Sequence, residues 1–265
     1  MIELDKIYNE DCLEGMKRIP DGSIDCVICD LPYGTTACKW DIVIPFEPLW
    51  EQYERVCKPD AAIVLFGSQP FTSFLITSNI LSFRESLVWV KNKASNGFMS
   101  CNRHLKTHED IVVFSFSANY TFNQSKWNVS EDFVIKRKTM EITEETNNIA
   151  GISVKGRIRK CDDGSRMPIS LLPFKVPYSP KKDSKTKNGD FRVHPTQKPV
   201  ELLRYLIRTY SNEGDVVLDN CMGSGTTAIA CIREHRRFIG FETDAVYYEK
   251  ACERISLEQR QLSLF

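Results

Sequence analysis

The sequence has no hydrophobic run of the length that a membrane span requires. Its longest apolar stretches fall far short of the roughly 18 residues needed to cross a bilayer. The first residues also lack the basic and then apolar pattern of a secretory signal peptide. We therefore expect a cytoplasmic protein without a membrane partner.

Cysteines are present, but a metal-binding arrangement of them is not. Cys26-x-x-Cys29 has a metal-like spacing among the ten cysteines, yet no second pair completes a set of four ligands. Cys26 and Cys29 also lie in a predicted strand, where alternate side chains point to opposite faces. The pattern predicts reduced, structural thiols and no metal site.

The chain has no net charge, because 35 acidic residues balance 35 basic ones. This balance conceals an uneven distribution. Residues 153–193 contain eleven Lys or Arg and four Asp, a net charge of +7, which leaves −7 for the rest of the chain. A basic segment on a neutral protein indicates a polyanionic partner. The alternative is a solvated loop whose lysines have no special function.

The sequence does contain an alternation of strand and helix patterns. Short apolar runs predict strands at 2–8, 24–29, 61–66, 83–90, 111–116, 216–219 and 237–242. Amphipathic stretches predict helices at 12–19, 46–57, 71–81, 200–210, from the loop after 219 to 231, and at 245–258. This alternation predicts an α/β fold with a doubly wound, mostly parallel Rossmann-like sheet. Residues 117–193 lose the periodicity and predict an inserted region, partly mobile near 181–189.

The stretch Asp30-Leu31-Pro32-Tyr33-Gly34 follows the predicted buried strand at 24–29. Open α/β sheets place their ligands just past the carboxyl ends of their strands. A carboxylate, a backbone carbonyl and an aromatic ring at this point suit a planar base that carries an amino group. The alternative is a simple turn, in which Pro32 and Gly34 reverse the chain and Asp30 caps a helix.

A Gly-rich loop follows the predicted strand at 216–219. Asp219 ends that strand, Gly223-x-Gly225 comes next, and Glu242 ends the following strand, 17 residues past Gly225. Such glycines let the backbone approach a ligand, and an acid at the second strand end can accept hydrogen bonds from ribose hydroxyls. The pattern predicts an adenosine-bearing cofactor. A tight turn of structural importance only is the alternative.

The loop has no lysine where a phosphate-binding loop would carry Gly-Lys-Ser/Thr. Gly223-x-Gly225-x-x-Ala228 fits a dinucleotide-binding loop loosely, but Asp219 places a negative charge where a pyrophosphate would lie. A carboxylate at this point suits a cofactor with an amino or sulfonium group. S-adenosylmethionine is such a cofactor.

The order of these two motifs resembles that of the amino-group DNA methyltransferases of the permuted, beta-type order. In that family a catalytic Asp-Pro-Pro-Tyr motif precedes the cofactor-binding loop, as Asp30-Leu-Pro-Tyr33 precedes Asp219-Asn-Cys-Met-Gly-Ser-Gly-Thr226 here. Phe66-Gly-Ser-Gln-Pro70 and His108-Glu109 match further stretches of the family. The resemblance covers roughly residues 1–116 and 194–262. It implies a catalytic half at 1–116, a target-recognition region at 117–193 and a cofactor-binding half at 194–265.

The resemblance also implies roles for individual residues. His194-Pro-Thr-Gln-Lys-Pro199 is similar to the segment that caps the methionine end of the cofactor, and Asp11 to the acid that meets the adenine amino group. The implied cofactor-binding set is Asp11, Asp30, His194, Thr196, Gln197, Lys198, Asp219, Met222, Gly223, Ser224, Gly225, Thr226 and Glu242. The implied catalytic set is Asp30, Leu31, Pro32 and Tyr33.

An acidic first residue of the catalytic motif resembles adenine-N6 enzymes more than cytosine-N4 enzymes, which usually carry Ser. The implied activity is methylation of adenine N6 in double-stranded DNA after base flipping. Leu31 departs from the family's Pro, but the motif uses the backbone carbonyl at that position, which Leu also provides. No Pro-Cys pair is present, so a covalent cysteine route is not indicated.

The resemblance implies that the DNA lies against basic and aromatic side chains. The candidates are Lys39, Trp40, Arg103, Lys106, Arg157, Arg159, Lys160, Lys181 and Lys182, with packing as the alternative for Trp40. A homodimer and a cognate restriction endonuclease are candidate partners. Four alternatives stay open: a cytosine-N4 enzyme, an enzyme acting on RNA or a protein amide, an inactive DNA- or nucleotide-binding module, and a nicotinamide dehydrogenase.

Overall fold

A computed structural model of the chain describes residues 2–35, 41–95, 97, 100–124, 148–149, 152–153, 168–177 and 197–262. The chain divides into two compact units. The first contains Met1–Asn123 and Ile169–Phe265, and the second contains Gln124–Pro168. In the second unit the described strands are an antiparallel pair, β6 (Asn148–Ile149) and β7 (Ile152–Ser153).

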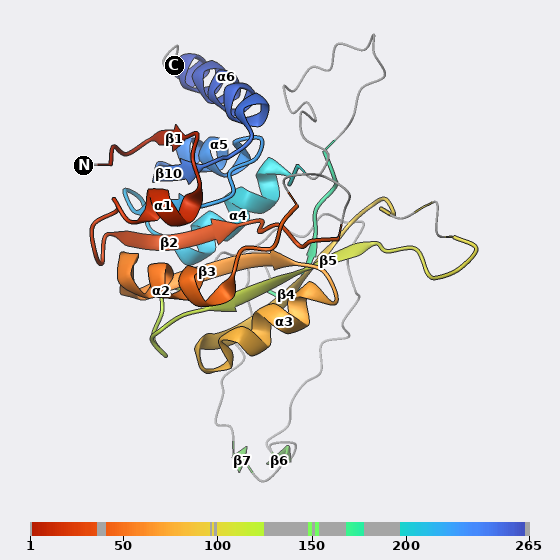
Figure 1. The fold of residues 1–265 in the computed structure, drawn as a ribbon. Coiled ribbons are helices and arrows are strands. Elements are labelled where there is room, and N and C mark those ends of the chain that lie inside the picture. Colours follow the sequence, from red (N-terminus) through yellow and green to blue (C-terminus); the bar gives the residue numbers. More distant parts are fainter. Residues whose placement is uncertain are drawn as a thin grey trace, which may run out of the picture. The chain divides into compact units, whose positions relative to one another are not determined.

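The first unit is built on an eight-stranded sheet with the order β1-β10-β9-β2-β3-β5-β4-β8 (Figure 1). The strands are β1 (Lys6–Tyr8), β2 (Ile24–Cys29), β3 (Cys57–Gly67), β4 (Phe83–Val90), β5 (His108–Phe114), β8 (Leu171–Pro173), β9 (Val216–Asp219) and β10 (Arg237–Phe241). All neighbours are parallel except β5, which is antiparallel to both β3 and β4. The predicted α/β class with a mostly parallel, Rossmann-like sheet is confirmed.

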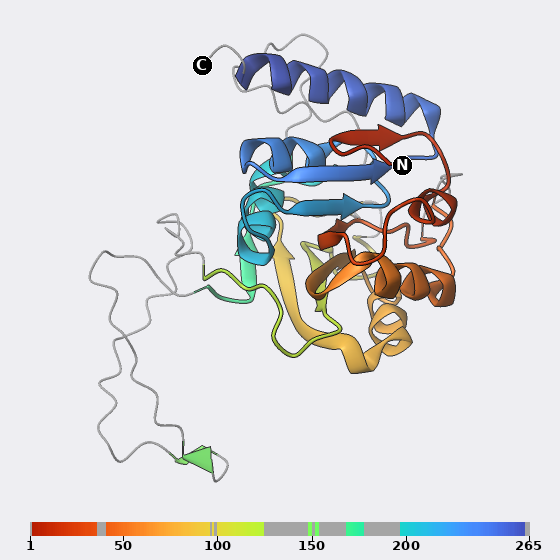
Figure 2. The same ribbon diagram turned by 90° about the vertical axis from the view of Figure 1, so that its left-hand side faces the viewer.

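Helices cover both faces of this sheet (Figure 2). On one side α1 (Cys12–Met16) packs against α2 (Phe46–Val56), and α2 packs against α3 (Phe71–Ser78), which a short 3-10 helix at Ile80–Ser82 follows. On the other side α4 (Val200–Tyr210) packs against α5 (Thr226–Arg233). The last helix, α6 (Ala245–Leu262), contacts α5 and β1. No helix in the described part of the chain is long and apolar enough to span a membrane.

Several predicted elements agree with the structure to the residue, notably β2, β4, β9 and α4. The first strand is shorter than predicted, because Asp5 has a left-handed φ of 61° that an extended strand excludes. The predicted helix at 12–19 ends at Met16. β3 begins at Cys57, four residues before the apolar run that predicted it.

Two parts of the predicted insertion pack with the first unit. β8 pairs with β4 as the last strand of the sheet. The sequence did not predict this strand, because three residues are too few to show the alternating hydrophobic pattern of a strand. Tyr120 and Phe122 lie against the ring of Tyr210 on α4, and the Asn123 side chain donates to the carbonyls of Arg208 and Ser211. The functional division at 1–116, 117–193 and 194–265 stays a prediction.

The strands at the centre of the sheet are buried on both faces. Every residue of β2 except Asp25 is buried, and so are residues 61–67 of β3. A strand covered by helices on both sides has no solvent face, so its sequence is a continuous apolar run and not an alternating one. This rigid centre fixes the positions of the strand ends, which carry the predicted site.

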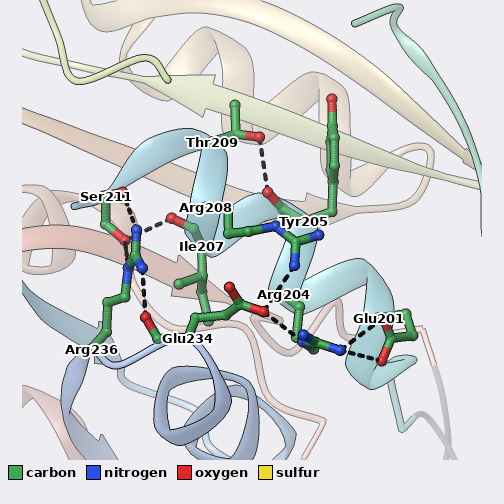
Figure 3. A network of polar contacts seen from close by, with 9 residues as sticks. All are labelled: Glu201, Arg204, Tyr205, Ile207, Arg208, Thr209, Ser211, Glu234 and Arg236. Carbon is green, nitrogen blue, oxygen red and sulfur yellow. Dashed lines mark hydrogen bonds and ion pairs between the residues drawn. The ribbon is translucent and has the colours of Figure 1, made fainter. Parts of the chain in front are cut away.

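A buried arginine joins the end of α4 to the turn between α5 and β10 (Figure 3). The Arg236 guanidinium donates to the carbonyl of Ser211 at 2.7 Å, to its hydroxyl at 3.1 Å and to the carbonyl of Glu234 at 2.5 Å. The Glu234 carboxylate in turn accepts hydrogen bonds from Arg204 and Arg208 on α4. The network therefore satisfies backbone groups that the two helix ends leave unpaired.

Replacing Arg236 with methionine is expected to lower the free energy of unfolding by about 2–4 kcal/mol, because the carbonyl of Glu234 would lose its donor and that of Ser211 would keep only the Asn123 side chain. Urea unfolding measures this loss. The matched control is Arg237→Met, since that side chain is about half exposed and pairs with Asp5 at the surface. An equal loss in both variants would contradict a special role for the network.

Candidate active site

A cavity of about 430 Å³ lies at the carboxyl ends of the central strands. Its lining includes Asp30 to Tyr33, which follow β2, and Asp219 to Ser224, which follow β9. Glu242, which follows β10, and Asp11, which precedes α1, also line it. Because β2, β9 and β10 are parallel, their carboxyl ends meet at one edge of the sheet.

The stretch that follows β2 contributes a carboxylate and an aromatic ring. The Tyr33 hydroxyl donates a hydrogen bond of 2.6 Å to Oδ1 of Asp30. The Tyr33 ring packs against Phe71 of α3, with the ring centroids 5.1 Å apart. Burial raises the pKa of Asp30, while the nearby Lys198 ammonium acts against this and the Glu109 carboxylate adds to it.

The backbone after Tyr33 is held by a carboxylate from further along the chain. Asp41 accepts hydrogen bonds from the N–H of Gly34 at 2.8 Å and from that of Thr35 at 2.9 Å. Asp41 is buried and lines the same cavity. Sequence reasoning did not select Asp41, since nothing periodic marks a residue in an irregular loop.

Asp219, at the start of the Gly-rich loop, and Glu242, after β10, both accept hydrogen bonds from the backbone of the loop. Asp219 accepts hydrogen bonds from the N–H of Cys221 at 3.1 Å and from the Thr227 hydroxyl at 2.5 Å. Glu242 accepts one from the N–H of Gly223 at 2.8 Å through Oε2, and Oε1 accepts one from Asp244. Burial raises the pKa of Asp219 to about 6 and raises that of Glu242 as well.

The sequence profile of a family described as DNA methylase (N6_N4_Mtase) matches residues 24–253. The chain belongs to this DNA methylase family. The type II methyltransferase M1.MboII of Moraxella bovis is 29% identical over 95% of this chain and 96% of its own length.

Two solved structures share the fold of this DNA methylase. The M1.HpyAVI-SAM complex has a TM-score of 0.61 and 23% identity, and the match covers 94% of this chain and 98% of that one. The PvuII DNA methyltransferase, described as cytosine-N4-specific, has a TM-score of 0.65 and 17% identity, with coverage of 94% and 85%. Because the identities are below 25%, these two comparisons show a shared fold and nothing more specific.

Most of the predicted cofactor-binding residues that the structure describes lie around the cavity at the carboxyl ends of the strands. Met222, Gly223, Ser224 and Thr226 line it. Gly225 does not line it. Gly225 instead occupies the N-cap position of α5, with a left-handed φ of 76° that favours glycine. A Cβ at this position would also lie only 3.1 Å from the Cβ of Ala251 on α6, so the close packing of the two helices favours glycine as well.

Residues from two other segments complete the predicted set. Asp11 accepts hydrogen bonds from the N–H groups of Leu13 and Glu14 and thereby caps α1. Gln197 and Lys198 are buried and line the cavity. The Lys198 ammonium contacts Asp30 and lies 3.3 Å from Glu109. His194 and Thr196 lie outside the described residues.

The structure describes two of the predicted DNA-binding residues, Arg103 and Lys106. Arg103 is exposed, and the partly buried Lys106 donates to the Ser68 hydroxyl. The others lie outside the described residues: Lys39, Trp40, Arg157, Arg159, Lys160, Lys181 and Lys182.

Sequence reasoning did not assign a role to Glu109, which lines the cavity from β5. Its Oε1 accepts a hydrogen bond from Lys91, which follows β4. The sequence signal that could have pointed to Glu109 was the match of His108-Glu109 to a stretch of the family. The distance between Glu109 and Asp30 along the chain gave no indication that the two side chains lie in the same site.

Proposed function

We propose that this DNA methylase transfers a methyl group from S-adenosylmethionine to the N6 amino group of adenine in DNA, after the base has flipped out of the duplex. One observation carries the proposal. The stretch Asp30 to Tyr33 and the Gly-rich loop with Glu242 line the same cavity, although more than 180 residues of sequence separate the two motifs. A methyl donor and an acceptor amine must lie next to each other for direct transfer.

The residues around the cavity fit this cofactor. A volume of about 430 Å³ is within the usual range for small-molecule sites. Each oxygen of Glu242 accepts one backbone hydrogen bond, and a carboxylate oxygen can accept two, so both can also accept from ribose hydroxyls. Asp219 and Asp11 add negative charge and acceptors for the amino groups of the cofactor. When bound, S-adenosylmethionine supplies a methyl group on a positively charged sulfur.

The residues after β2 suit a flipped adenine. The lone pair of its amino nitrogen is delocalised into the ring, which makes the nitrogen a poor nucleophile. Asp30 and the Leu31 carbonyl accept hydrogen bonds from the two amino hydrogens and favour a localised lone pair. Tyr33 offers a ring for the base to stack on, which offsets part of the cost of unstacking, a few kcal/mol.

The acidic first residue of the motif, Asp30, supports adenine over cytosine as the target. The cytosine-N4-specific PvuII enzyme nevertheless shares the fold, so the experiment must separate the two. Duplex DNA is incubated with the enzyme and with S-adenosylmethionine labelled in the methyl group, and the nucleosides of the digest are resolved. We expect label in N6-methyladenine. Label in N4-methylcytosine only, or transfer only to RNA or to a protein amide, would replace the proposal.

The proposal extends to the partners of the enzyme. Double-stranded DNA is the substrate, the target-recognition region is at 117–193, and the enzyme works in the cytoplasm where the DNA lies. A homodimer and a cognate restriction endonuclease complete the proposed setting. The name of M1.MboII, a type II methyltransferase, supports a role in restriction and modification.

The affinity for DNA is expected to fall steeply with salt, because lysines and arginines of 153–193 would displace counterions from the phosphates. The double variant Lys181→Ala, Lys182→Ala should reduce the slope of log Kd against log salt by about 1–2, as measured by fluorescence anisotropy. Lys17→Ala, which changes an exposed lysine directly after α1, is the control. A slope that is flat, or that the double variant leaves unchanged, removes the basic segment from the DNA interface.

A further inference from the structure

Asp30 belongs to a chain of four buried or partly buried charges that joins four elements of the first unit. Lys198, which precedes α4, contacts Oδ2 of Asp30 and lies 3.3 Å from Oε2 of Glu109 on β5. Glu109 also pairs with Lys91, which follows β4. The side chains of Lys198, Lys91 and Glu109 are 7%, 8% and 15% exposed, and that of Asp30 is 24% exposed, so water screens these charges only partly.

The ammonium of Lys198 is placed between two carboxylates and over an aromatic ring. Its nitrogen lies 4.9 Å from the centroid of the Phe66 ring. Burial lowers the pKa of Lys198, but Asp30 and Glu109 outweigh it and hold that pKa above its ordinary value. The contact with Glu109 is an ion pair and not an aligned hydrogen bond, since Oε2 has no hydrogen-bond partner among the described residues. Glu109 therefore acts on Lys198 mainly through its charge.

The two carboxylates differ in their hold on a proton. Burial raises the pKa of Asp30, and the Glu109 charge adds to this. The pKa of Glu109 lies below its ordinary value, because Lys198 and Lys91 together outweigh its burial. The charged or titratable groups that face this cluster from the surrounding elements are Tyr33, Asp219 and Cys29 near Asp30, and Lys106 near Glu109. Relative to an ordinary carboxyl group, the surroundings therefore favour proton uptake at Asp30 and disfavour it at Glu109.

Methylation of an amine requires a group that takes up a proton. The nitrogen lone pair forms the new N–C bond, the S–C bond breaks with its electron pair remaining on sulfur, and the nitrogen must then release one proton. The Tyr33 hydroxyl and Lys198 each occupy one acceptor position on Asp30, and a carboxylate offers about four. Asp30 can therefore accept from the amine and take its proton, provided that it is ionised beforehand.

We propose that Lys198 and Glu109 are positioning residues for Asp30: Lys198 orients the Asp30 carboxylate and keeps it ionised, and Glu109 offsets the charge of Lys198 so that Asp30 still accepts a proton from the amine. This inference rests on the proposed function. It gives Lys198 a role toward the acceptor amine, in addition to its place in a segment predicted to bind the cofactor.

The test compares Lys198→Met, Glu109→Gln and Lys198→Arg with the unaltered protein. Asp30 works as a carboxylate, so the single-turnover rate declines as the pH falls through its pKa. Loss of the Lys198 charge raises that pKa, so the decline should move to higher pH by about one unit or more. Loss of the Glu109 charge lowers it, so the decline should move to lower pH and the maximum rate should fall. Lys198→Arg keeps the positive charge, so the pH at which its rate declines should stay close to that of the unaltered protein, whatever its maximum rate.

The Asp30 titration is also followed without cofactor or DNA, by infrared difference spectra of the carboxylic acid band assigned with Asp30→Asn. The same opposite displacements are expected there. The midpoint of the double variant Lys198→Met, Glu109→Gln should lie between those of the two single variants and above that of the unaltered protein, because Lys198 acts on Asp30 more strongly than Glu109 does. Lys58→Met is the control, because Lys58 pairs with Asp25 at the amino ends of β3 and β2. A midpoint that stays fixed, or that moves in one direction in both single variants, overturns the inference. This readout does not depend on whether the protein methylates adenine.

Discussion

Asp30→Ala is expected to lose methyl transfer by about 100- to 1,000-fold, while its affinity for S-adenosylmethionine changes only a few-fold. The variant removes the group that accepts from the target amine and takes its proton, and the loss of one preorganised group of this kind costs about 10²–10³ in rate. The cofactor half of the cavity keeps Asp219, Glu242 and the Gly-rich loop. The rate is measured in single turnovers with labelled cofactor, and the affinity by calorimetry.

Two further variants sharpen this result. Asp30→Asn keeps the size of the side chain but loses its charge, and should be nearly as inactive as Asp30→Ala. Asp60→Asn makes the same change at an exposed position of β3 and should leave the rate unaltered. Near-normal turnover in Asp30→Ala would end the mechanism, whereas a parallel loss of cofactor affinity would mean that Asp30 serves the cofactor as well.

Glu242→Gln is expected to weaken the binding of S-adenosylmethionine by about 10- to 100-fold, with a smaller change in the rate at saturating cofactor. The glutamine has one acceptor oxygen, so it cannot hold the N–H groups of Gly223 and Asp244 and both ribose hydroxyls as the carboxylate can. Hydrogen bonds to a charged acceptor are also about twice as strong as those to a neutral one.

Calorimetric titration with the cofactor measures the effect of this change. The control is Glu253→Gln, an exposed position on α6. Unchanged affinity in Glu242→Gln would remove the ribose contact from the account. The two predictions are complementary, because Asp30 should control the rate and Glu242 the affinity.

The sequence was sufficient to locate the two halves of the candidate site. Short apolar runs such as Ile24–Cys29 and Val216–Asp219 are typical of central strands, and a parallel sheet brings the residues after them to one edge. Asp30, Asp219 and Glu242 therefore line the predicted cavity. The individual roles assigned to these residues stay predictions.

Local patterns did not reveal how short or irregular segments are used. β8 is three residues long, and its place beside β4 depends on backbone hydrogen bonds, not on a period. Asp41 binds the backbone of Gly34 and Thr35 from within an irregular loop. Gly225, predicted as a cofactor residue from its place in the loop, packs against α6, which a loop motif alone does not show.

The class of fold, the order of the motifs and the acids at the strand ends follow from the amino-acid pattern, because hydrophobic periodicity is a local property that sets where each strand ends. The pairing of Lys198 with Asp30, 168 residues away, and its continuation through Glu109 and Lys91 became visible in the folded chain alone. Contacts of this kind arise where separate elements pack together. No spacing along the chain encodes them, and the low polarity of the site makes their electrostatic effect large.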